Sequence, residues 1–137
     1  MNAARRGVRA FTGADTNLPP QGARSAITDY VDQKDDSAFA AGMVVFQNCK
    51  FEWRLWYDEI LFCHRVDGLF AVTVQGSRYQ LEPGDALWLP RATTITYESE
   101  GRSWLFFAVA PANWRETRPP DVQPPGSGTS RWVRARS

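Results

Sequence analysis

Four side chains that can transfer a proton stand close together in the middle of the chain. Tyr57, Asp58 and Glu59 are consecutive, and His64, the single histidine, follows them closely. Glutamate becomes a general base near neutral pH when burial raises its pKa, whereas histidine titrates there unaided. We predict Glu59, His64 and Tyr57 as catalytic residues, with Glu59 or His64 as base and Tyr57 stabilising negative charge. The alternatives are that Asp58 and Glu59 form an exposed turn pair, and that His64 lies on a solvent face or is satisfied within the wall.

Charged and aromatic side chains near this group are candidates for binding a substrate. Arg54 can bind a carboxylate through two hydrogen bonds, although it can equally pair with the nearby Glu52. Tyr97 can donate a hydrogen bond to an oxyanion. Three of the aromatic candidates have core filling as their alternative role: Trp56, Trp88 and Phe106. The predicted substrate-binding residues are Arg54, Glu52, Trp56, Trp88, Tyr97 and Phe106.

Composition is typical of a globular protein with one domain. The chain has 137 residues, of which 43% are hydrophobic and 23% charged, and its formal net charge is +1. This weak charge gives little support for nucleic acid binding. Because no run of about 18 apolar residues and no secretory signal is present, we expect no membrane partner and a cytoplasmic location. Cys49 and Cys63 are expected to be buried thiols, with a disulfide as the alternative.

Short segments with alternating polarity, separated by turn residues, predict an all-β domain. In residues 51–57, Glu52 and Arg54 share one face and Phe51, Trp53, Leu55 and Tyr57 share the other. Asp67-Gly68 predicts a two-residue hairpin, and residues 100–102 predict a turn. The spacing leaves no room for crossover helices and therefore predicts an antiparallel sandwich or barrel. The predicted strands are 42–47, 51–57, 59–66, 69–75, 78–81, 86–89, 93–98 and 104–110.

The two ends of the chain differ in composition from the middle. We predict an extended or partly disordered N-terminal arm over residues 1–37, a β-barrel domain over residues 38–115 and a Pro- and Arg-rich tail over residues 116–137. Within the arm, residues 27–31 form a β-like patch that can dock on the barrel. The end of the tail, residues 131–136, can contact an acidic partner, although a solvated tail is the main expectation.

Several motifs of this sequence resemble those of a known family. Gly84-Asp85, followed by Pro90, resembles the second cupin motif, in which the glycine turns the chain and the proline closes the next strand. The wider pattern resembles the ethanolamine-utilisation cupins of the EutQ type, and this implies a single small cupin β-barrel, or jelly roll. The segment from Glu59 to Gly68 is longer than the family pattern, which predicts a bulge there. The matching motifs are Trp53-Arg54-Leu55-Trp56-Tyr57-Asp58-Glu59, Asp67-Gly68, Pro83-Gly84-Asp85, Leu89-Pro90, Thr93-Thr94-Ile95 and Pro111-Ala112-Asn113-Trp114.

The resemblance also bears on metal binding, because a typical cupin holds its metal with three histidines and a glutamate. Here Glu52 and Arg54 stand near the paired histidine positions, Glu59 matches the acid, and Ile95 replaces the last histidine. Arginine and isoleucine cannot ligate a metal. We therefore expect no cofactor, with a divalent metal held by Glu52, Glu59 and His64 as the alternative.

The residues and the resemblance are compatible with three functions. The first is a metal-independent enzyme, a lyase, isomerase or cyclase, that uses acid–base chemistry on a small molecule with or without a carboxylate. The second, implied by the resemblance, is an acetate-kinase activity, for which the sequence has no glycine-rich phosphate loop. The third is a non-catalytic ligand-binding or assembly module. Under each of them we expect a homodimer.

Overall fold

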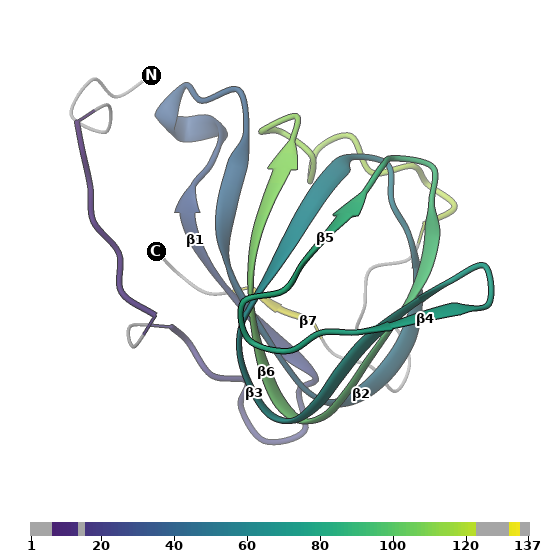
Figure 1. Cartoon of the computed structure of the whole chain (residues 1–137). Helices are drawn as coiled ribbons and strands as arrows, with labels where there is room; N and C mark the ends of the chain where they lie inside the picture. The colour runs from purple at the N-terminus through teal and green to yellow at the C-terminus, as the bar shows by residue number, and fades with distance from the viewer. Residues whose placement is uncertain (1–6, 14–15, 123–131, 135–137) are drawn as a thin grey trace.

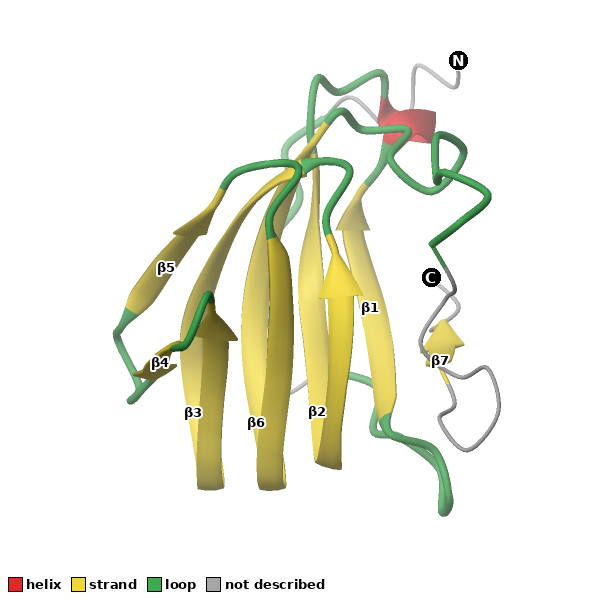
Figure 2. Cartoon of the chain, turned by 90° about the vertical axis from the view of Figure 1, so that its right-hand side faces the viewer, coloured by secondary structure: helices red, strands yellow, loops and turns green. Residues whose placement is uncertain are grey.

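The computed structural model describes residues 7–13 and 16–122 and the backbone of residues 132–134. Its strands form one curved sheet that does not close on itself (Figures 1 and 2). The sheet folds around an apolar core. The sheet order is β4-β3-β6-β2-β1-β7. Strand β5 pairs with the first part of β3, and β4 pairs with its last part. The predicted all-β class is confirmed. The elements are β1 (Ser25–Val31), the 3-10 helix η2 (Gln33–Asp35), β2 (Ala40–Arg54), β3 (Asp58–Val74), β4 (Ser77–Gln80), β5 (Ala86–Leu89), β6 (Thr94–Ala110) and β7 (Trp132–Arg134).

Three long strands take the place of the short strands expected from the turn signals. β2, β3 and β6 have 15, 17 and 17 residues, and Gly68 of β3 lies directly opposite Gly101 of β6. A Cβ on Gly68 would lie 2.1 Å from the carbonyl oxygen of Glu100, and one on Gly101 would lie 2.2 Å from that of Asp67. The predicted hairpin at Asp67-Gly68 and the predicted turn at residues 100–102 are therefore wrong. These glycines allow two paired strands to approach closely where the sheet bends.

Two bulges interrupt the long ladders. One lies between Gln47 and Cys49, where Asn48 has φ 45° and its Oδ1 accepts a hydrogen bond of 2.8 Å from the Gly101 N–H. The other lies between Cys63 and Arg65, so the bulge predicted between Glu59 and Gly68 is confirmed. Since a bulge changes the register of a strand, the inward alternation that begins at Glu59 stops at Cys63.

The predicted β-like patch at residues 27–31 does dock on the sheet, as part of β1. This strand pairs antiparallel with β2 and parallel with β7. Residues 131–136, predicted to contact an acidic partner, lie partly outside the described residues. Of this segment, the structure describes residues 132–134, which pair with β1 at the edge of the sheet. In the described residues, no helix has the length and apolar character needed to cross a membrane. Cys49 and Cys63 are free and buried, as expected.

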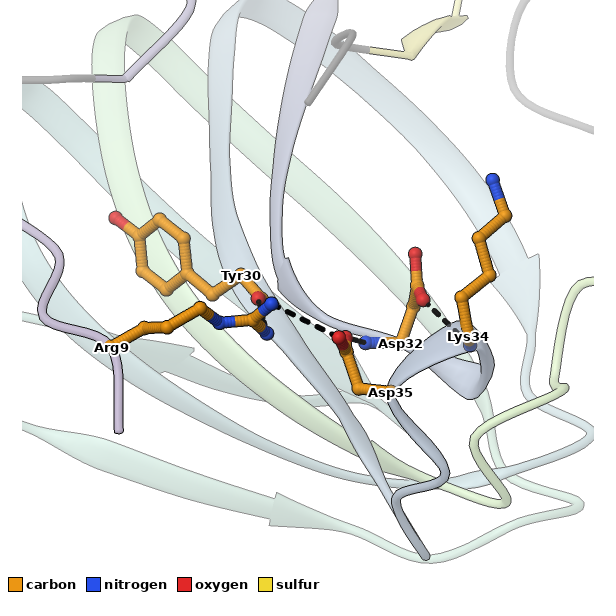
Figure 3. Close-up of polar contacts among 5 residues, drawn as sticks. All are labelled: Arg9, Tyr30, Asp32, Lys34 and Asp35. Carbon is orange, nitrogen blue, oxygen red and sulfur yellow. Dashed lines mark hydrogen bonds and ion pairs between the residues drawn. The ribbon is translucent and has the colours of Figure 1, made fainter. Parts of the chain in front are cut away.

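The N-terminal arm is held against η2 and β1. The Arg9 guanidinium donates hydrogen bonds of 3.0 Å to Asp35 Oδ1 and 3.0 Å to the carbonyl oxygen of Tyr30 (Figure 3). Asp35 is buried, and its Oδ2 accepts a further hydrogen bond of 2.9 Å from the Asp32 N–H. Phe11 stacks on the Tyr30 ring with a centroid distance of 4.3 Å. Residues 9–11 of the arm are thus anchored by the contacts of Arg9 with Asp35 and Tyr30 and by the stacking of Phe11 on Tyr30.

Candidate active site

The curved sheet encloses a cavity of about 30 Å³. A void of about 10–15 Å³ holds one water molecule, so this cavity has room for a ligand of only a few atoms. Of the described residues, no lysine, arginine or histidine lines it. Five of the lining side chains carry a polar group, namely Trp53, Tyr57, Glu59, Tyr97 and Trp114, and the others are Ile27, Val44, Phe46, Leu61, Phe107 and Val109.

Four of these polar side chains reach the same interior from three strands and one connection. Trp53 lies near the end of β2, and Tyr57 lies in the short connection to β3. Glu59, the second residue of β3, pairs with Leu89 of β5 on one side and Val109 of β6 on the other. Tyr97 comes from β6. Because each of these residues shares its face with buried apolar neighbours, burial of that face carries the polar groups inside.

Glu59 is a buried carboxyl group in mainly apolar surroundings. Its side chain is 6% exposed, and its Oε1 accepts a hydrogen bond of 3.1 Å from the Tyr97 hydroxyl. Burial raises the pKa of Glu59 from 4.5 to about 8, and the hydrogen bond from Tyr97 acts against this rise. Near neutral pH the group therefore exists as the neutral acid and in part as the carboxylate, and this raised pKa is the condition under which the sequence analysis predicted Glu59 as a general base.

Tyr57 is held by a residue that the sequence analysis did not select for the site. The Trp53 indole Nε1–H donates a hydrogen bond of 2.9 Å to the Tyr57 hydroxyl oxygen. Burial, followed by the nearby Glu59, raises the pKa of both Tyr57 and Tyr97 well above 10, so both keep their protons. The signal for Trp53 was present in residues 51–57, where it shares the alternating face of Tyr57.

The charged candidates lie outside this cavity. His64 is exposed at the β3 bulge, with its ring beside Gly13, and Glu52 is exposed on β2. Arg54 donates hydrogen bonds of 2.9 and 2.8 Å to the two carboxylate oxygens of Asp121. In the described part of the chain, no three His, Cys, Asp or Glu side chains form a group that could hold a metal ion. The alternative metal site of Glu52, Glu59 and His64 is therefore not assembled, and the cupin metal does not fit here.

The remaining aromatic candidates also miss the cavity wall. Trp56 packs against Trp114 and donates a hydrogen bond of 2.6 Å to its carbonyl oxygen. Trp88 is 60% exposed, because it alternates with the buried Leu89 on β5. Phe106 packs beside Tyr30, away from the interior that Phe107 faces. Of the candidates, the structure brings together Glu59, Tyr57 and Tyr97.

Comparison with known proteins agrees with this architecture. A sequence model of the ethanolamine utilisation protein EutQ family matches residues 8–116. The chain belongs to this family. The protein named acetate kinase EutQ of Salmonella typhimurium is 30% identical over 89 residues, which is 65% of this chain and 38% of that protein. The protein of the same name from Clostridioides difficile is 22% identical over 59% of this chain and 50% of its own length. The chain thus spans only part of the curated family members it matches.

Solved structures establish the fold. The crystal structure of a putative ethanolamine utilisation protein from Salmonella typhimurium has a TM-score of 0.67 at 26% identity, over 82% of this chain and 91% of that one. The cupin domain of Cnp3 from Schizosaccharomyces pombe has a TM-score of 0.60 at 16% identity, over 80% and 78%. The predicted cupin fold and the predicted EutQ type are both confirmed.

Proposed function

We propose that this chain is a small-molecule enzyme that moves a proton within the cupin cavity through Glu59. One observation carries the proposal: a carboxyl group sits in an apolar cavity, with the Tyr97 hydroxyl on one of its oxygens. Burial of an ionisable group is costly, and a core without function would favour an apolar residue there. A pKa of about 8 also lets Glu59 exist in both protonation states near neutral pH.

The chemistry open to this group is a proton shift between two atoms of one substrate. Neutral Glu59 gives its proton to one substrate atom, and the carboxylate that remains accepts the hydrogen bond from Tyr97. The carboxylate then takes a proton from a second substrate atom, which restores the neutral acid. Such a step is common to isomerases and to many lyases and cyclases, and it needs no co-reactant.

An acetate-kinase-like activity is the second candidate, because curated relatives carry that name. Phosphoryl transfer depends on cationic groups and metal ions around the phosphates. None of the described residues that line the cavity is cationic. The cavity therefore supports proton transfer better than phosphoryl transfer, and an assay of acetyl phosphate formation from acetate and ATP tests this second candidate directly.

The primary test is deuterium exchange in heavy water. Small aldehydes, ketones, hydroxy acids and amino acids are incubated with the protein, and loss of their carbon-bound protons is followed by proton NMR. We expect faster exchange than in buffer for at least one class, and loss of that acceleration in Glu59→Gln. Glu100→Gln, which changes an exposed carboxylate of the same sheet, is the control. Absence of acceleration for every class, or equal rates for Glu59→Gln and the unmodified protein, would overturn the proposal.

A further inference from the structure

The cavity contains a hydroxyl proton whose direction is set by a neighbouring indole. The Tyr57 oxygen accepts the Trp53 Nε1–H at 2.9 Å, so the Tyr57 proton cannot point toward Trp53. Among the described residues, no acceptor takes the proton of Tyr57. Since Tyr57 is buried and lines the cavity, its O–H group is available to a molecule inside.

Glu59 offers a second donor to the same space. Its Oε1 is taken by the Tyr97 hydroxyl at 3.1 Å, so the proton of the neutral acid resides on Oε2. No further hydrogen bond to this carboxyl group comes from the described part of the chain. The Tyr97 hydroxyl proton is donated to Glu59, so Tyr97 cannot also donate a hydrogen bond to a ligand.

The rest of the lining cannot satisfy these two donors. Leu61, Phe107 and Val109 present only carbon atoms and so offer no acceptor to either donor. A ligand that supplies an acceptor oxygen with two lone pairs can accept a hydrogen bond from both groups. A cationic ligand would meet two donors, and a fully charged anion would find no cation among the described lining residues.

We infer that the cavity binds the carbonyl oxygen of a small neutral aldehyde or ketone between the hydroxyl groups of Tyr57 and Glu59, with Trp53 as the positioning residue that directs the Tyr57 proton. The inference rests on the proposed function, because it names a substrate class for the same Glu59 site. A tyrosine beside a neutral carboxylic acid is an arrangement that stabilises carbonyl oxygens as they gain charge. The space of about 30 Å³ favours a small ligand, and acetone is the simplest ketone with which to test the site.

The test is carbon-13 NMR of acetone labelled at its carbonyl carbon, titrated with the full chain. We expect a saturable downfield shift, because hydrogen bonds withdraw electron density from the carbonyl group. Tyr57→Phe removes one donor and is expected to weaken binding about tenfold or more. Trp53→Phe is expected to reduce the shift per bound molecule, since the Tyr57 proton loses its fixed direction. Tyr79→Phe, at an exposed ring on β4, is the matched control and keeps the full effect.

Two further comparisons sharpen the result. The hydrocarbon 2-methylpropene has the shape of acetone without the acceptor oxygen, and we expect it not to displace bound acetone. Raising the pH above about 8 ionises Glu59, so acetone binding is expected to fall there. Absence of a saturable shift, or the same shift in Tyr57→Phe, would overturn the inference even if Trp53→Phe fails to fold.

The outcomes also separate this inference from the proposed function. Acetone that binds with the expected shift, while no compound exchanges deuterium, would support the carbonyl site and reject the enzyme. Accelerated exchange that depends on Glu59, together with no acetone shift, would support the enzyme and reject the carbonyl site.

Discussion

The hydroxyl of Tyr97, on β6, donates a 3.1 Å hydrogen bond to Oε1 of Glu59, near the start of β3. This contact joins two long strands across the interior and gives a buried carboxyl group its polar partner. The hydrogen bond favours the ionised form of Glu59, whereas burial favours the neutral form and is the larger effect. The balance between the two sets the pH range in which the cavity can exchange a proton.

Removing this hydrogen bond is expected to raise the pKa of Glu59 further. In Tyr97→Phe, burial continues to disfavour the carboxylate, but the donor that opposed it is lost. The pKa should therefore rise above about 8, as measured by carbon-13 NMR titration of the Glu59 side-chain carboxyl carbon. Tyr79→Phe should leave the titration unchanged. A pKa that stays constant or falls in Tyr97→Phe would show that the phenol does not stabilise the carboxylate.

Stability should fall with rising pH because of Glu59. The native pKa is raised to about 8 from 4.5, so the stabilising contribution is complete below about pH 4.5 and is lost as pH rises through about 8. Within this window unfolding releases a proton, and the unfolding equilibrium constant rises by up to about tenfold per pH unit. Urea denaturation between about pH 5 and pH 8 measures this slope. Glu59→Gln should remove it and Glu100→Gln should retain it. Equal slopes in the two variants would contradict the assignment.

Gly68 is expected to tolerate no side chain. In Gly68→Ala the new Cβ would lie 2.1 Å from the carbonyl oxygen of Glu100, at a residue with φ 143°. Gly76 also has positive φ, but a Cβ there meets nothing within 4 Å. Gly76→Ala should thus cost about 1–2 kcal/mol of unfolding free energy, and Gly68→Ala clearly more. Denaturant titration of both variants checks the order, and similar losses would mean that the backbones can separate at the bend.

The ion pair of Arg9 and Asp35 should contribute more to stability than an exposed pair. Asp35 is 4% exposed, so Arg9→Ala removes a cation from beside a buried carboxylate and should cost about 1–3 kcal/mol. Arg54 and Asp121 are 45% and 66% exposed, and Arg54→Ala should cost less than about 1 kcal/mol. Amide hydrogen exchange at residues 9–11 adds a local readout. Unchanged protection in Arg9→Ala would show that the Arg9 ion pair does not hold the arm.

Some features of the site follow from the amino-acid sequence alone. Alternation in residues 51–57 puts Trp53 and Tyr57 on one face, and a motif resemblance indicates the fold and matches Glu59 to the acid of the first cupin motif. These features are local, because side-chain direction in a strand depends on a period of two residues. The family and its cupin fold could therefore be predicted before the structure was known, whereas the structure shows a curved sheet that does not close into a barrel.

Other features depend on contacts between residues that are distant in the chain. The bulge at Cys63 and Arg65 leaves His64 outside, and alternation about Leu89 leaves Trp88 exposed. Gly68 has the sequence signal of a hairpin, yet its partner Gly101 makes it part of a continuous strand.

The sequence by itself determined the strand pattern, the motifs and the presence of Glu59 beside Tyr57. Only the tertiary structure decided that Tyr97 donates to Glu59 and that Trp53 orients Tyr57. Periodicity assigns a side chain to a face, but pairing across the sheet decides which faces meet and what is buried between them. A carboxyl group changes its proton affinity only when that burial is complete, so its chemistry is a property of the fold.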